Sequence, residues 1–176
     1  PTLRSVLELI KAEKDRPTTH LYAELKSDGD FAGSAFAAGM PEATAREVRS
    51  VGVSPKHLSF ISFSAGALNA TRKLLPDYNY YLVAHAETPV EAMDSARLAA
   101  DSGFDGIDLN ADALNINEAF VRFVHAQKMR LLVWVWRHPA TNDNQEMWDL
   151  MRSRKVDIFT TNIVESERLR SRATCL

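Results

Sequence analysis

The chain has 176 residues, of which 45% are hydrophobic and 25% charged, and its formal net charge is -2. These values are typical of a single globular domain, and the lack of a basic excess disfavours nucleic acid as a partner. No apolar run approaches the roughly 18 residues that span a membrane. The only cysteine, Cys175, excludes an internal disulfide and leaves the compartment open, whether cytoplasmic, periplasmic or secreted.

The first half of the chain predicts strands that alternate with helices. Leu3, Leu7 and Ile10 recur at helical spacing, and Thr2 stands before them as an N-cap. In chain order we expect a helix over 1–14, a strand over 21–26, a helix over 41–50, a strand over 57–63, a helix over 64–75 and a strand over 78–85.

The second half continues the same alternation. Segment 88–103 has the clearest helix boundaries, because Thr88 and Glu91 fit a capping box, Pro89 occupies the first turn and Gly103 ends the helix. After it we expect a strand over 104–110, a helix over 116–128, a strand over 130–136, a helix over 142–154, a strand over 156–162 and a closing helix over 164–172.

One leading helix followed by six βα units predicts an α/β fold with a parallel sheet and right-handed crossovers. A doubly wound open sheet and a (β/α)8 TIM barrel both fit this order. No glycine-rich phosphate loop follows a strand, which weakens the nucleotide-binding doubly wound alternative. A barrel usually needs about 200 residues or more. We therefore expect residues 1–176 to form a single domain with about six βα units of a barrel, and the first two units to precede Pro1.

Polar residues gather where the predicted strands end. In a barrel, the carboxyl ends of the strands form the face that carries the active site. Glu24 and Lys26 stand out, because side chains alternate along a strand and these two charges share one face of an otherwise apolar segment. The other polar strand ends are Ser62 and Ser64, His85, Asp108 and Asn110, Trp136 and Arg137, and Thr161 and Asn162.

The segments PTLRSVLELIK, LYAELK, SFISF, RLLVWVW and VDIFTTN follow one another at suitable intervals across nearly the whole chain. In this order they resemble the glycerophosphodiester phosphodiesterase family. The resemblance implies a (β/α)8 barrel and a hydrolase of lipid metabolism. Such a phosphoric diester hydrolase converts a small-molecule glycerophosphodiester into glycerol 3-phosphate and an alcohol, usually with a divalent cation, Mg²⁺ or Ca²⁺.

The resemblance gives Glu24 and Lys26 specific roles. Glu24 matches the third acidic metal ligand of the family, and Mg²⁺ and Ca²⁺ both take carboxylate oxygens. Lys26 lies on the same strand face, where it would meet the negative charge of a phosphodiester and stabilise charge that grows during transfer. The alternative for both residues is a structural ion pair with each other.

Aromatic residues are the next candidates for substrate binding. Phe63 stands at the end of the Ser-Phe strand of the family, and Trp134 matches its Val-Trp position, so both would form an apolar wall near the substrate. Trp136 shares a strand face with Trp134. A plain packing role remains the alternative for these side chains.

Three polar residues at strand ends have two interpretations each. Asn110 and Asp108 share one face of their strand, so either could line the mouth of the pocket and contact substrate. Asp108 could instead cap a turn. His85 could act as an acid or base, or form structural hydrogen bonds.

Parts of the family pattern are not found in this sequence. The His-Arg-Gly, Glu-x-Asp and His-Asp segments, which by resemblance carry two metal ligands and the acid–base histidines, are expected upstream of Pro1. Thr161-Asn162 also replaces the Thr-Asp of many members. We therefore assign no catalytic residue within the chain and expect residues 1–176 alone to be inactive.

Two other functions stay open. The first is a non-catalytic phosphate-binding or regulatory barrel module that lacks the acid–base half. The second is an unrelated sugar-phosphate barrel, which the absence of a glycine-rich loop after the last strands disfavours. The alcohol group of the substrate, the choice of metal and the oligomeric state are not encoded in any motif.

Overall fold

Six parallel strands form the frame of the molecule. The computed structural model describes residues 1–12, 19–26, 39–112, 114–135 and 143–162. All neighbouring strands in the sheet are parallel and follow one another in sequence order, which confirms the predicted arrangement. The strands are β1 (Leu21–Glu24), β2 (Leu58–Ser62), β3 (Asn79–Ala84), β4 (Gly106–Asn110), β5 (Arg130–Trp134) and β6 (Ile158–Phe159).

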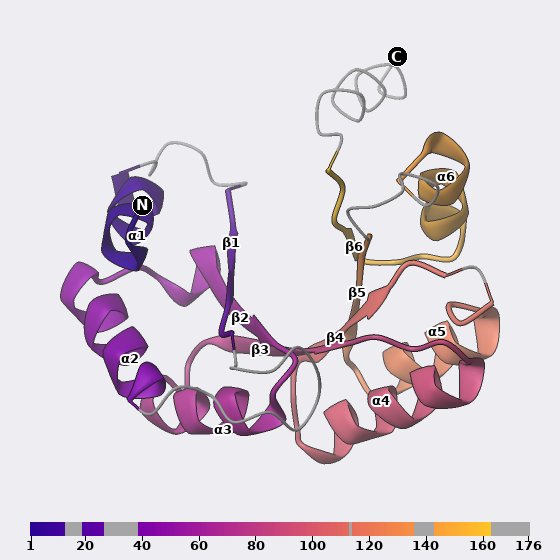
Figure 1. Cartoon of the computed structure of the whole chain (residues 1–176), viewed down its shortest axis with the longest axis horizontal. Coiled ribbons are helices and arrows are strands. Elements are labelled where there is room, and N and C mark those ends of the chain that lie inside the picture. The colour runs from indigo at the N-terminus through magenta and orange to yellow at the C-terminus, as the bar shows by residue number, and fades with distance from the viewer. Residues whose placement is uncertain (13–18, 27–38, 113, 136–142, 163–176) are drawn as a thin grey trace.

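Helices connect these strands and cover one side of the sheet. They are α1 (Leu3–Ala12), α2 (Met40–Val51), α3 (Ala65–Leu74), α4 (Pro89–Asp101), α5 (Glu118–Ala126) and α6 (Gln145–Ser153), with a 3-10 helix η1 (Pro55–His57). Figure 1 shows the sheet curled like part of a barrel wall, with α2, α3, α4 and α5 along its convex side. The fold is therefore a half-barrel with alternating strands and helices, as the α/β barrel prediction required. The helix expected over 164–172 lies outside the described residues.

Local sequence explains where most helices begin. Side-chain oxygens accept hydrogen bonds from backbone N–H groups that the first helical turn leaves free. The predicted box at α4 is only half formed. Thr88 accepts from the Glu91 N–H, whereas the Glu91 carboxylate accepts from the Glu87 N–H, one residue before the cap. The same kind of cap is formed by Thr2 for α1, Ser64 for α3, Asn117 for α5 and Asn144 for α6.

The hydrophobic core lies between the convex side of the sheet and the helices. Because side chains alternate along each strand, every second residue enters this core. Phe60 shows the packing, since it is fully buried and its ring stacks on that of Tyr80 with the centroids 5.4 Å apart. The strand residues that face this core are Leu58, Phe60, Tyr80, Leu82, Ile107, Leu109, Leu131 and Val133.

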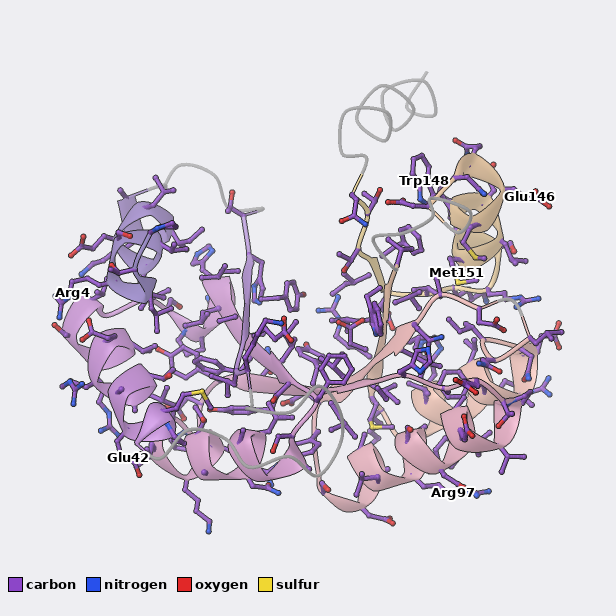
Figure 2. The ribbon with its side chains drawn as sticks, in the orientation of Figure 1. Arg4, Glu42, Arg97, Glu146, Trp148 and Met151 are labelled. Carbon is purple, nitrogen blue, oxygen red and sulfur yellow. The ribbon has the colours of Figure 1, made fainter. Side chains whose placement is uncertain are left out.

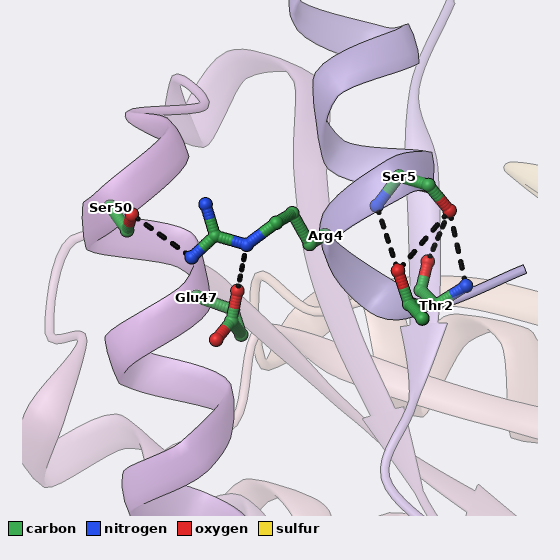
Figure 3. A network of polar contacts seen from close by, with 5 residues as sticks. All are labelled: Thr2, Arg4, Ser5, Glu47 and Ser50. Atoms are coloured by element: carbon green, nitrogen blue, oxygen red, sulfur yellow. Dashed lines mark hydrogen bonds and ion pairs between the residues drawn. The ribbon is translucent and has the colours of Figure 1, made fainter.

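Polar contacts join the first two helices (Figure 3). The Arg4 guanidinium on α1 lies 2.8 Å from the Glu47 carboxylate on α2 and donates to Ser50. These side chains are partly exposed, so the contact orients α1 more than it stabilises the fold. Figure 2 shows the labelled Arg97 and Glu42 on the outer, solvent side of α4 and α2. Across the described residues, the helices are too short or too polar to cross a bilayer.

Candidate active site

The carboxyl ends of the strands bring the predicted site residues to one rim of the half-barrel. Glu24 ends β1, Asn110 ends β4 and Trp134 ends β5, while His85 directly follows β3. Asn110 and Trp134 are register partners on adjacent strands. In a parallel sheet these ends point the same way, so the predicted common rim holds for the residues described. Trp136 lies outside the described residues.

Glu24 and Lys26 form an ion pair at this rim. Glu24 Oε2 lies 2.8 Å from Lys26 Nζ, and the two side chains retain 31% and 77% of their accessible surface. An ion pair this exposed stabilises a fold by only about 0–1 kcal/mol. The ion pair between Glu24 and Lys26, which was the structural alternative for both residues, is therefore present. It is weak enough to rearrange when a charged ligand binds.

Bulky side chains fill the inner face of the sheet below the rim. The rings of Tyr22 and Tyr81 lie 5.9 Å apart. Gly106 permits this packing, because a Cβ there would lie 2.1 Å from the Arg130 carbonyl oxygen and 2.8 Å from Tyr81 Cδ1. Burial raises the pKa of Tyr81, so its hydroxyl stays neutral. Tyr22, Tyr81 and Arg130 thus lie on the inner face below the rim, where Tyr81 is buried and Arg130 stays exposed.

Asp108 lies one step below the rim on this inner face. It is only 4% exposed, and its Oδ1 has no hydrogen-bond partner among the described residues. Burial, and to a lesser extent the charge of Glu24, raise the pKa of its carboxyl to about 7. Within the described residues, the turn-capping alternative for Asp108 is not seen. Its neighbours Asp105 and Asp112 do bond the main chain, since Asp105 accepts from the Tyr80 N–H and Asp112 from the Leu114 N–H.

Asn110 uses both ends of its amide on the main chain. Its Oδ1 accepts from the Ala86 N–H at 2.7 Å, and its Nδ2 donates to the Ala86 carbonyl at 3.1 Å. Asn115 donates to the same carbonyl at 2.8 Å. These bonds fix the segment after β3 at the rim. A contact of Asn110 with substrate stays a prediction. In the structure, the Asn110 amide holds the segment after β3 through its two hydrogen bonds to Ala86.

Aromatic rings gather at the rim beside Asn110. The Phe63 and Trp134 rings meet edge to face with centroids 6.0 Å apart, and His85 lies 6.4 Å from Trp134. The Trp134 indole donates to the Ala84 carbonyl. Phe63 and Trp134 are each half-buried, so they pack against one another and still present surface at the rim. The structure thus brings together two of the predicted substrate contacts.

The other described histidines serve as structural groups. His20 contacts the Lys56 carbonyl at 2.9 Å and the Ser59 hydroxyl at 2.8 Å, and burial lowers its pKa. His57 contacts the Thr19 carbonyl, and His125 lies 3.1 Å from Asp157. In the part of the chain that the structure describes, no group of three or more His, Cys, Asp or Glu side chains is placed to hold a metal.

Sequence reasoning missed Asp143, which organises the last part of the rim. Its Oδ1 accepts from the Trp148 indole and the Thr161 hydroxyl, and its Oδ2 accepts from the Asn162 N–H at 2.6 Å. Asp143 is 3% exposed. A buried acid just before a helix cap would have been a usable signal, but on sequence alone it resembles an ordinary first-turn acid.

Solved structures share this fold. A candidate glycerophosphoryl diester phosphodiesterase from Silicibacter pomeroyi superposes with a TM-score of 0.70 at 20% identity, over 92% of this chain and 52% of its own. A glycerophosphodiester phosphodiesterase from Parabacteroides distasonis superposes with a TM-score of 0.68 at 24% identity, over 98% of this chain and 65% of its own. A glycerophosphodiester phosphodiesterase from Agrobacterium tumefaciens superposes with a TM-score of 0.60 at 14% identity, over 92% of this chain and 58% of its own. At these identities the likeness shows the fold alone, and the chain spans about half to two thirds of each structure's length.

Sequence comparison supplies the family. No curated protein matched the sequence. The model of the glycerophosphoryl diester phosphodiesterase family matches residues 1–166, which is nearly the whole chain. The matched region contains all six strands and the rim on which Glu24, Asn110 and Trp134 lie. The chain belongs to the glycerophosphoryl diester phosphodiesterase family.

Proposed function

We propose that the intact protein hydrolyses a glycerophosphodiester to glycerol 3-phosphate and an alcohol, and that Glu24 binds a divalent cation, Mg²⁺ or Ca²⁺. The observation that carries this proposal is the charge pair at the end of β1. Glu24 and Lys26 lie 2.8 Å apart on the rim of a half-barrel whose sequence belongs to a phosphodiesterase family. Such a rim is where enzymes of this barrel fold carry out their chemistry.

The donor chemistry at this rim fits a hard cation. Mg²⁺ and Ca²⁺ take carboxylate oxygens and complete their shells with water or phosphate oxygens. Glu24 offers a partly exposed carboxylate for this purpose. When bound, the cation would neutralise negative charge that develops on the phosphate oxygens. We propose that further protein ligands come from the Glu-x-Asp segment that the family resemblance implies.

The side chains at the rim would each act on a different part of the substrate. The Lys26 ammonium, which is 77% exposed, is free to swing from Glu24 toward a phosphate oxygen. Phe63 and Trp134 would form an apolar wall against the carbon skeleton, and Trp136 is proposed to extend it. In the proposed reaction, an oxygen of water or of a neighbouring substrate hydroxyl would bond to phosphorus as the P–O bond to the alcohol breaks. The acid–base histidines that the resemblance implies would take the proton of this nucleophile and give one to the leaving alcohol.

A cation titration of hydrolysis tests the proposal. The assay follows release of glycerol 3-phosphate by the intact protein against Mg²⁺ and Ca²⁺ concentration, for the wild type, Glu24→Gln and Glu118→Gln. Glu118 is a matched control because it forms an exposed ion pair with Arg122, at 3.4 Å, on helix α5. We expect Glu24→Gln to raise the cation requirement by at least about tenfold and Glu118→Gln to leave it unchanged.

Two results would contradict the proposal. Unchanged cation dependence in Glu24→Gln would assign Glu24 to the structural pair with Lys26. Phosphate-ester binding by the wild type without release of glycerol 3-phosphate at any cation concentration would instead favour the non-catalytic phosphate-binding module.

A further inference from the structure

The proposed function leaves one charged group on the inner face unexplained. Asp108 is only 4% exposed, and its Oδ1 makes no hydrogen bond to any described residue. A buried carboxylate without partners is unfavourable in a folded protein, and buried charges are usually paired or bound to metals. Asp108 therefore has a buried carboxylate oxygen that no hydrogen bond within the described residues uses.

Two nearby buried polar side chains, Asn110 and Asp143, differ from Asp108 in their hydrogen bonds. Asn110, two residues further along β4 on the same face, has both amide atoms bonded to Ala86. Asp143, which is equally buried, accepts three hydrogen bonds. Both side-chain polar atoms of Asn110 and of Asp143 are thus hydrogen-bonded, whereas Asn115 keeps a buried Oδ1 without a partner among the described residues. Asp108 differs from Asn110 and Asp143 in this respect, so a structural hydrogen-bonding role does not account for it.

The position of Asp108 relates it to Glu24. The parallel register places Asp108 beside Val83 and Leu132 on the inner face, one step below the rim formed by Asn110 and Trp134. Burial is the main cause that raises the pKa of Asp108, and the negative charge of Glu24 adds to it. Two carboxylates that repel each other across an inner face become favourable once a cation lies between them.

We propose that Asp108 is a second carboxylate ligand, which together with Glu24 holds the divalent cation from below the rim. The inference rests on the proposed function, because it concerns the same cation, and it adds a ligand that the motif resemblance does not assign. It also accounts for the unpartnered Oδ1, since a hard cation takes carboxylate oxygens directly.

Binding of the metal alone tests this inference without any assay of activity. Calorimetry and thermal unfolding of the intact protein would measure its affinity for Mn²⁺, Mg²⁺ and Ca²⁺ in the wild type, Glu24→Gln, Asp108→Asn and Asp94→Asn. Asp94 is the control, because it is an exposed acid paired with Arg97 on α4 and its substitution removes the same charge. We expect Glu24→Gln and Asp108→Asn each to weaken affinity at least about tenfold, and Asp94→Asn to leave it unchanged.

The possible outcomes separate the two proposals. Weakened affinity in Glu24→Gln with unchanged affinity in Asp108→Asn would overturn this inference and leave the proposed function intact. Unchanged affinity in both variants would overturn the cation site as a whole. Asp108→Glu provides a second variant, since it keeps a carboxylate and should retain more affinity than Asp108→Asn.

A wild-type measurement removes any dependence on variants that fold poorly. Paramagnetic Mn²⁺ at substoichiometric concentration should broaden the side-chain carboxyl ¹³C signals of both Glu24 and Asp108. It should leave the carboxyl signal of Asp94 sharp. Broadening of the Glu24 signal with a sharp Asp108 signal would also overturn the inference.

Discussion

The outer and inner faces of the curled sheet are built from alternating residues of the same strands, yet they differ in chemistry. The outer face is apolar and covered by helices, and the Tyr80 hydroxyl there donates to the Leu75 carbonyl at 2.7 Å. The inner face instead carries Tyr81, Arg130 and Asp108, and Asp108 Oδ1 makes no hydrogen bond within the part of the chain that the structure describes.

This difference separates stability from function. On β4, Leu109 enters the core while its neighbour Asp108 faces inward, so adjacent residues contribute to different properties. Changes on the outer face should alter the free energy of unfolding and leave the chemistry intact. Changes to the exposed charges Glu24 and Lys26 at the rim should do the reverse, whereas Asp108 is buried, so its substitution should affect both properties.

The largest expected effect concerns residues 1–176 as an isolated polypeptide. We expect no measurable hydrolysis of glycerophosphodiesters, because loss of general acid–base groups alone typically lowers a rate by about 10²- to 10⁴-fold. The assay uses purified residues 1–176 with added Mg²⁺ or Ca²⁺. Turnover that disappears in Glu24→Gln would refute this prediction and would mean that a residue such as His85 transfers the proton.

Removing the Phe60 side chain should have the largest effect on stability. Phe60 is fully buried on the outer face and stacks on Tyr80, so Phe60→Ala should lower the free energy of unfolding by about 3–5 kcal/mol. Urea denaturation would measure the loss. If the folded fraction of this variant also lost its cation affinity, the separation of the two faces would be wrong.

Asp108 should make stability depend on pH in the cation-free protein. Its pKa is about 7 in the fold, against 3.8 when exposed, so between these values the folded state holds a proton that the unfolded state has lost. Stability should therefore fall as pH rises from about 4 to 7, by at most about 4 kcal/mol from this group. Denaturation across this range should show the advantage of Asp108→Asn over wild type growing with pH and then levelling off. A constant difference would contradict the buried, unpaired state of Asp108.

Lys26→Met should change stability least. The ion pair with Glu24 is exposed, so its loss should alter the free energy of unfolding by less than about 1 kcal/mol. The KM of the intact protein for its phosphodiester should nevertheless rise, because the variant lacks the ammonium group that meets the phosphate. Equal KM values for Lys26→Met and wild type would assign Lys26 to the ion pair alone.

The alternation of predicted strands and helices was enough to give the order and direction of the strands. It also placed Glu24, His85 and Asn110 on one rim, because a parallel sheet aligns all strand ends. Helix caps such as Ser64 and Thr88 depend on neighbours within three residues and were equally accessible. These features share a local cause, which is why one sequence suffices to predict them.

The electrostatics of the site depend on contacts that sequence does not display. The influence of Glu24 on Asp108 requires the sheet to curl, since β1 and β4 are not neighbours. The bonds between Asn110 and Ala86 similarly depend on the path of the chain after β3. Spacing along the chain shows that Asp108 and Asn110 share a face, but only the fold shows that one is satisfied and the other is not.

The most direct test of the division between the two faces is a paired measurement on Glu24→Gln in the intact protein. Hydrolysis and the free energy of unfolding would be determined on the same preparation, with Glu118→Gln as the control for loss of an exposed carboxylate. The account predicts that Glu24→Gln lowers hydrolysis at limiting cation by at least about tenfold while the free energy of unfolding changes by less than about 1 kcal/mol. Full activity in Glu24→Gln, or a loss of activity explained entirely by unfolding, would contradict it.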